Sequence, residues 1–279
     1  VVCARLGEWA LRYPRSRVRK SLLQYGTRRG SGLKRSDARN SLRSRRWSPS
    51  KPRSTCCNWG ACWPTTPCGR RAPAWSRCNI FLRAGTPVDA PNRLLEAAQE
   101  IQQFCRSRNW RFCFIGGIAV QRWGEARLTR DADLTVYTGI GDELRYIEAL
   151  LGAFKSRFES AREFALGHRV LLLRASNGIP LDVTLGALPF EDKAVASASA
   201  EEIVAGVRLQ LAPPGALVVF KVFANRPQDW LDVEGIIVKS GHLINWEEVR
   251  ADLAVLLELN DDTTALGRLD ELLVRCSAS

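Results

Sequence analysis

The sequence lacks any long uninterrupted apolar run, and it contains no methionine. A membrane-spanning helix needs roughly 20 consecutive apolar residues, and no stretch approaches that length. The first residues, VVCARLGEWALRYPRSR, contain no apolar core of a secretory signal. We therefore expect a cytoplasmic protein without a membrane partner. With no methionine and a valine in first place, the sequence does not mark the start of translation.

Groups for thiol or imidazole nucleophilic catalysis are also scarce. The chain has only two histidines, and His168 has no acidic residue at a matching position. Cys105 and Cys113 lie on predicted apolar faces, where a cysteine usually packs as a small hydrophobic residue. A cysteine- or histidine-based nucleophilic site is therefore not expected.

Acidic residues are almost absent from the first 86 residues, which hold 20 Lys and Arg against 2 acidic residues. Residues 87–279 hold 21 basic against 27 acidic residues, so the net charge of +12 describes neither part. A content of 46% hydrophobic residues over 279 residues is enough to bury a core, which excludes a wholly disordered protein.

Residues 1–86 show no hydrophobic period near 3.6 or 2, so we predict a largely irregular segment. Four interpretations stay open. In the first, the segment is an arginine-rich arm that binds nucleic acid, with tryptophans for base stacking. In the second, it is an organelle transit segment. In the third, it is a zinc site, although its six cysteines lack paired C-x2-C spacing. In the fourth, it is the translation of a GC-rich upstream region and not native coding sequence.

Hydrophobic periodicity becomes regular from residue 87 onward. The pattern predicts helices over 89–105, 118–123, 144–158, 217–224, 228–239, 245–257 and 264–275, and strands over 111–115, 131–137, 169–175, 179–185 and 201–211. This order predicts an α+β fold: a mixed sheet with flanking helices over 87–212, followed by a helical C-terminal part over 213–279.

The clearest hairpin joins Arg169–Ala175 to Ile179–Leu185 through Ser176, Asn177 and Gly178. Asn-Gly is a preferred pair in tight turns that match the twist of the flanking strands. The hairpin places Asp182 in the middle of an otherwise apolar strand. A charge there needs a partner or a metal.

Three aspartates form the first candidate site. Asp131 and Asp133 alternate at the start of a predicted strand, so their side chains project from one face. Asp182 joins them if its strand is adjacent. Three carboxylates on adjacent strands can hold two Mg²⁺ ions roughly 3.5–4 Å apart, one activating a hydroxyl and one binding the leaving pyrophosphate.

Gly116 and Gly117 end one predicted strand and open a helix. Glycines at such a position let backbone N–H groups approach a triphosphate closely. Each element alone has a simpler explanation, because a D-x-D pair arises by chance and Gly-Gly is usually a turn. Their order along one short segment favours a phosphate-transfer site.

The run FIGGIAVQRWGEARLTRDADLTV, from Phe114 to Val136, resembles the signature of the nucleotidyltransferase (DNA polymerase β-like) fold superfamily. The R-x-T-x-D-x-D form within it, with Arg127 and Thr129 before the aspartates, is similar to the AbiEii and MenT nucleotidyltransferase toxins and their relatives. The resemblance covers about residues 90–240. The spacing after Arg226 departs from the toxin pattern, because Gln228 and Asp229 replace a more basic stretch.

The resemblance implies a role for each matching residue. Asp131 and Asp133 would bind the metal, and Asp182 would be the third acidic ligand and a base. The nucleotide would be bound by Gly116, Gly117, Arg127, Thr129, Lys221, Arg226, Asp229 and Asp232, with Lys221 holding the triphosphate. The simpler interpretation of the group from Lys221 to Asp232 is a solvated helix surface with local ion pairs.

We therefore predict an Mg²⁺-dependent enzyme that moves a nucleoside monophosphate from an NTP to a hydroxyl acceptor. We expect an RNA 3′ end or a protein side chain as the acceptor, and the resemblance implies a toxin–antitoxin component with a cognate antitoxin. One alternative is a nucleotidyltransferase acting on a small molecule such as an aminoglycoside. A second alternative is a non-catalytic nucleic-acid-binding protein that uses the arginine-rich arm.

Overall fold

A mixed sheet of seven strands forms the centre of the described part of the chain, residues 90–259 and 264–277 of a computed structural model. The segment 1–86, with the interpretations attached to it, lies outside those residues. The strands are β1 (Phe112–Phe114), β2 (Ala132–Tyr137), β3 (Lys155–Ser156), β4 (Val170–Arg174), β5 (Pro180–Gly186), β6 (Ser199–Val204) and β7 (Val207–Leu211). They lie in the order β3-β4-β5-β2-β1-β7-β6.

The pairing of β2 positions the site. β2 pairs with β1 in antiparallel and with β5 in parallel orientation, and its register places Asp133 opposite Asp182. Both strands are buried over nearly their whole length, as is typical of strands at the centre of a sheet with both faces covered. The expected adjacency of the two aspartate-bearing strands is therefore confirmed.

The predicted hairpin is present as β4 and β5, which pair in antiparallel orientation. The Gly178 N–H donates to the Ala175 carbonyl at 2.9 Å, and Gly178 has a φ of +84°. A positive φ is readily adopted by glycine, so this residue permits the tight turn. The hairpin brings β4 to the outer side of the aspartate-bearing strand β5.

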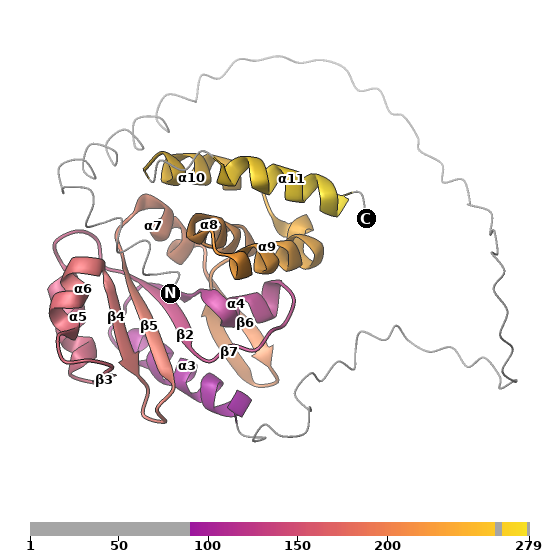
Figure 1. The fold of residues 1–279 in the computed structure, drawn as a ribbon. Coiled ribbons are helices and arrows are strands. Elements are labelled where there is room, and N and C mark those ends of the chain that lie inside the picture. The colour runs from indigo at the N-terminus through magenta and orange to yellow at the C-terminus, as the bar shows by residue number, and fades with distance from the viewer. Residues whose placement is uncertain (1–89, 260–263, 278–279) are drawn as a thin grey trace, which may run out of the picture.

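Helices cover the sheet and form the C-terminal part, as expected. They are α3 (Ala90–Ser107), α4 (Gly116–Trp123), α5 (Glu143–Leu151), α6 (Ala161–His168), α7 (Pro189–Ala196), α8 (Pro214–Ala224), α9 (Pro227–Ser240), α10 (Trp246–Leu259) and α11 (Ala265–Ser277), with a short 3-10 turn at Gly241–Leu243. Figure 1 shows α8 and α9 lying between the sheet and the outer pair α10 and α11. The mixed sheet with a helical C-terminal part confirms the predicted fold class.

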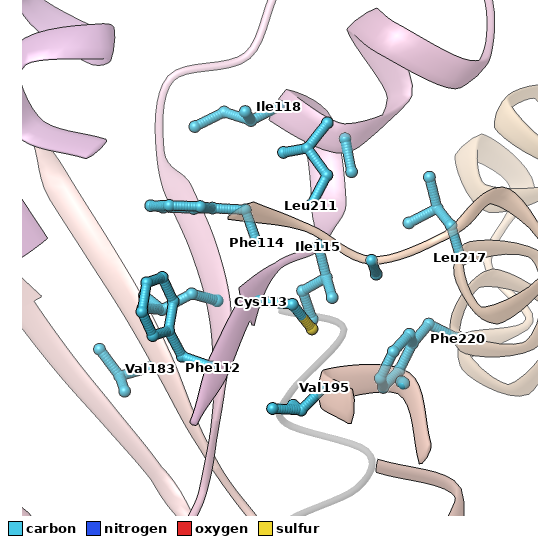
Figure 2. Close-up of a cluster of buried hydrophobic side chains, with 14 of the residues drawn as sticks. Phe112, Cys113, Phe114, Ile115, Ile118, Val183, Val195, Leu211, Leu217 and Phe220 are labelled. Atoms are coloured by element: carbon cyan, nitrogen blue, oxygen red, sulfur yellow. The ribbon is translucent and has the colours of Figure 1, made fainter. Parts of the chain in front are cut away.

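The core runs continuously from the sheet into the C-terminal helices. Figure 2 shows Cys113 and Ile115 directed toward Val195 of α7 and Phe220 of α8, while Phe112 lies on the side of Val183. One cluster of buried side chains extends from Leu94 to Leu272. The boundary near residue 212 that the sequence indicates stays a prediction. Among residues 90–259 and 264–277, no helix has the length and apolar character needed to cross a bilayer.

Two predicted elements are wrong in part. The helix expected over 144–158 ends at Leu151, where Gly152 follows and Lys155–Ser156 pair with β4 instead. Glycine disfavours helix continuation, and the residues that follow it pair with β4 as a short strand. The strand expected over 201–211 is a hairpin of β6 and β7, turned at Gly206 with a φ of +81°. Helices α6 and α7 were not predicted.

Candidate functional site

Three carboxylates meet where β2 and β5 begin. Asp131 immediately precedes β2, Asp133 is its second residue, and Asp182 is the third residue of β5. One oxygen from each carboxylate lies within 4.8 Å of one from each of the others. Asp133 and Asp182 are buried, with 7% and 2% of their surface exposed, and Asp131 is half-buried. The structure thus brings together the three residues that the sequence proposed.

Charge is unfavourable at Asp133 in the absence of a cation. Burial, and next the neighbouring charge of Asp131, raise the pKa of Asp133 from 3.8 to about 6. Two adjacent carboxylates repel each other, and a divalent cation relieves both the repulsion and the loss of hydration. The electrostatics of the pair therefore match a cation-binding role.

Thr129 orients the more exposed carboxylate. Its hydroxyl donates to the Asp131 Oδ1 at 3.2 Å. A Cβ added at Gly117 would lie 2.6 Å from the Thr129 Cβ, so helix α4 approaches Thr129 as closely as it does because residue 117 has no side chain. The R-x-T-x-D segment is thereby fixed against the start of α4.

Gly116 makes the equivalent close approach to Asp133. It has a φ of +63°, and a Cβ at this position would lie 2.6 Å from the Asp133 Cγ, overlapping the carboxyl group. The Ile115 N–H donates to the Asp133 carbonyl at 2.9 Å, which ties β1 to β2 at this point. The glycine pair therefore has a packing role that sequence reasoning did not assign. Its role as a phosphate cradle stays a prediction.

We expect Gly116→Ala to reduce the transfer activity that the sequence motif predicts by about 100-fold or more, because the new methyl group displaces the Asp133 carboxylate. Gly178→Ala is the matched control. Gly178 has a similarly positive φ of +84°, but a Cβ there meets no atom within 4 Å. Both variants carry the backbone strain of roughly 1–2 kcal/mol, and only Gly116→Ala adds the collision. Thermal unfolding and steady-state rates of both variants check this, and equal rates would contradict it.

A buried charge cluster adjoins the carboxylates, formed by Arg127, Lys221, Arg226, Asp229 and Asp232. The Lys221 ammonium lies 2.7 Å from Asp232 Oδ2 and 3.2 Å from Asp229 Oδ1. Arg127 binds both oxygens of Asp232, at 2.7 and 3.0 Å. Arg226 binds both oxygens of Asp229, at 2.6 and 2.9 Å. Two bidentate arginine–carboxylate pairs are thus bridged by one lysine.

This cluster is not a solvated helix surface, so that simpler interpretation is wrong. The side chains of Lys221 and Asp229 are 1% exposed and that of Asp232 is 2% exposed. Burial alone would raise the pKa of Asp232, but the hydrogen bond from Arg127 and the charge of Lys221 hold it below its ordinary value. The cluster joins the loop before β2 to α8 and α9. It therefore fixes the segment that carries Asp131 and Asp133.

The implied nucleotide ligands occupy different environments. The Arg127 and Arg226 side chains are 32% and 34% exposed, whereas Lys221 is enclosed with both of its carboxylate partners. The two arginines therefore have surface to offer a ligand while they hold the aspartates. A contact between Lys221 and a triphosphate stays a prediction.

Arg157 is a site residue that sequence reasoning missed. It follows β3 and forms an ion pair with Asp182. The sequence placed Arg157 inside the helix expected over 144–158, so its relation to β4 and β5 was hidden. Gly152 was the available signal, because it ends that helix before Arg157.

The pH dependence of stability tests the charge of Asp133. Its pKa of about 6 in the folded chain exceeds the ordinary 3.8, so the folded protein binds more protons between about pH 4 and pH 6. The free energy of unfolding therefore falls as the pH rises through this window, by up to about 3 kcal/mol, because the carboxyl group loses its proton. We expect Asp133→Asn to be more stable than the parent protein above pH 6 in a metal chelator and no more stable near pH 4. A stability difference that does not change with pH would refute this explanation.

Comparisons with solved structures find similar folds at low identity. The solution structure of the antibiotic-resistance factor ANT(2″)-Ia matches with 18% identity over 64% of this chain and 98% of that one, at a TM-score of 0.42. A nucleotidyltransferase-like antigen of Paracoccidioides brasiliensis matches with 18% identity over 64% and 94%, at 0.40. The lincosamide antibiotic adenylyltransferase LnuA, with lincomycin bound, matches with 13% identity over 50% and 94%, at 0.37.

No family model matches the chain, and no curated protein matches it. The structural neighbours include nucleotidyltransferases, and the similarity to the AbiEii and MenT toxins stays a prediction from the motif.

Proposed function

We propose that the chain is an Mg²⁺-dependent nucleotidyltransferase that moves a nucleoside monophosphate from an NTP to a hydroxyl group. The convergence of the Asp131, Asp133 and Asp182 carboxylates within 4.8 Å, beside the glycine pair that opens α4, carries this proposal. The sequence motif supports it independently, because its order of glycines and aspartates is the one the fold superfamily uses. The proposal assigns no role to residues 1–86.

The residues fit the metal that this reaction needs. Three carboxylates supply hard oxygen ligands, which Mg²⁺ prefers over nitrogen or sulfur. Burial and the charge of Asp131 raise the pKa of Asp133 more than Lys221 lowers it, and a cation bound beside the ionised carboxylate would offset that difference. When bound, the metal lowers the charge repulsion between nucleophile and triphosphate and stabilises the leaving pyrophosphate.

The reaction forms one bond and breaks one. The acceptor oxygen attacks the α-phosphorus, the bond from that phosphorus to the bridging oxygen of the β-phosphate breaks, and pyrophosphate leaves with the electron pair. The hydroxyl proton passes to the carboxylate group, with Asp182 as the proposed acceptor. Thr129 holds Asp131 in place during the transfer through its 3.2 Å hydrogen bond. Positioning and charge neutralisation supply most of the rate enhancement in phosphoryl transfer.

The nucleotide is held between the glycine pair and the buried charge cluster in this proposal. Gly116 and Gly117 open α4, whose first backbone N–H groups suit an anion. Arg127 and Arg226 offer partly exposed guanidinium groups to the phosphates. Lys221, Asp229 and Asp232 act mainly by fixing those two arginines.

The acceptor is an RNA 3′ end or a protein hydroxyl, and not a cationic antibiotic. A polycation would be attracted by acidic surface beyond the three metal ligands. Within residues 90–259 and 264–277, Asp229 and Asp232 adjoin the site, but both are buried and paired with Lys221, Arg127 or Arg226, so they offer no acidic surface to a polycation. A toxin role with a cognate antitoxin follows from the motif resemblance and is part of the same proposal.

A labelling experiment tests the function and the acceptor together. The full chain is incubated with Mg²⁺ and each of the four α-labelled NTPs, in turn with total RNA, with a protein extract and with tobramycin. We expect label in RNA or protein, with stoichiometric pyrophosphate release and no transfer in a chelator. Labelling of tobramycin alone would overturn the acceptor assignment, and absence of transfer in every mixture would overturn the proposed function.

A further inference from the structure

A row of side chains crosses the sheet from its edge to the carboxylates. Asp133 of β2 is in register with Asp182 of β5, and Asp182 is in register with Leu172 of β4. The Arg157 N–H donates to the Leu172 carbonyl at 3.0 Å, which continues the pairing of β3 with β4 by one residue. Residues in register project from the same face of a sheet. The backbone therefore directs Arg157 and the two aspartates to one face.

Arg157 spans the intervening strand to reach Asp182. The backbone of Arg157 and the backbone of Asp182 lie two strand spacings apart, about 10 Å. An arginine side chain covers this distance only when it is extended toward its partner. One terminal nitrogen binds Asp182 Oδ1, while the Arg157 Nε is buried without a hydrogen-bond partner. Leaving the Nε donor buried without a partner costs free energy. The ion pair with Asp182 offsets this cost and stabilises the side chain in this position.

The guanidinium changes the charge that the site offers to metal ions. Asp131, Asp133 and Asp182 carry three negative charges, and Arg157 offsets one of them at the Asp182 carboxylate. Asp131 and Asp133, to which no ion pair with Arg157 is assigned, together supply the carboxylate charge that balances one divalent cation. A second divalent cation bound through Asp182 would lie beside a fixed guanidinium and share a ligand with it. Both effects weaken a second metal site.

We infer that Arg157 is a positioning residue that occupies the third carboxylate and limits the aspartate site to one divalent cation. This inference rests on the metal site of the proposed function, and it departs from the two-ion site that three adjacent carboxylates otherwise predict. Arg157 takes over the charge compensation at Asp182 that a second ion would supply. Asp131 and Asp133 then hold the single ion.

The test counts bound Mn²⁺ ions by calorimetric titration of the full chain and by the loss of the free Mn²⁺ electron-paramagnetic-resonance signal. We expect one ion per chain in the parent protein and two in Arg157→Gln, which removes the charge and the ion pair. Arg157→Lys should keep one ion because it keeps the charge. Lys155→Gln is the matched control, because it removes a charge from the exposed part of the neighbouring strand β3 without touching the aspartates, and it should keep one ion.

Each outcome is decisive. Two ions in the parent protein, or one ion in a folded Arg157→Gln, would overturn the inference and leave the nucleotidyltransferase proposal standing. If Arg157→Gln does not fold, the count in the parent protein still decides. No bound Mn²⁺ in any of these proteins would overturn the metal site itself, and with it both proposals. Asp131→Asn should bind none, which locates the ions at the aspartates.

Discussion

Asp131→Asn and Asp133→Asn are expected to reduce nucleotidyl transfer by about 1,000-fold or more while the protein stays folded. Each substitution keeps the shape of the side chain and removes one charged oxygen ligand from the site. A metal contributes several kcal/mol to stabilising the transferring phosphate, and each 1.36 kcal/mol corresponds to about a tenfold change in rate. Loss of roughly 4 kcal/mol therefore accounts for the expected effect. Single-turnover rates at saturating NTP measure it.

Asp142→Asn is the matched control for this prediction. Asp142 is 65% exposed and pairs with Arg145 at the start of α5, away from the three carboxylates. The same chemical change there should leave transfer within about twofold of the parent rate, because exposed ion pairs contribute little. Unaltered transfer in Asp133→Asn would remove Asp133 from the catalytic group. The nucleotidyltransferase assignment would then lose its main support.

The aspartate site was predictable from sequence because local rules determine most of it. The D-x-D alternation puts Asp131 and Asp133 on one face of a strand wherever that strand lies. The Asn177-Gly178 turn fixes the hairpin that carries Asp182, and only the adjacency of β2 and β5 had to be assumed. An aspartate inside an apolar strand needs compensation, which restricts where such a strand can be placed.

The partners of these residues were not predictable in the same way. Arg157 meets Asp182 because an edge strand of two residues pairs with β4, and so short a strand leaves no periodic pattern. Lys221 also looked like a surface residue or a phosphate ligand from its spacing alone. Its enclosure depends on how α8 packs against α9 and on the loop that brings Arg127 to Asp232. Such long-range contacts are set by tertiary packing and not by local sequence.

Lys221→Met is expected to destabilise the protein by about 3–5 kcal/mol. Methionine approximates the length of the lysine stem, but it removes the ammonium group that the two buried carboxylates share. Each carboxylate then keeps only its own arginine partner. Removing one member of a buried ionic group costs this amount because the remaining charges stay out of water. For a folded domain of this size, the midpoint of thermal unfolding should fall by about 6–20 °C. Lys155→Met, at an exposed position of β3, should change it little.

A second substitution separates the structural role of Lys221 from nucleotide binding. If the lysine mainly compensates buried charge, then adding Asp232→Asn to Lys221→Met should cost less than the two single effects combined, because the neutral amide no longer needs the ammonium. The apparent kcat should then fall with the loss of folded protein, while the KM for NTP stays at the parent value. A Lys221→Met protein with the parent stability and a strongly raised KM would instead assign Lys221 to the triphosphate. In that case the ammonium must leave Asp229 and Asp232 when the nucleotide binds.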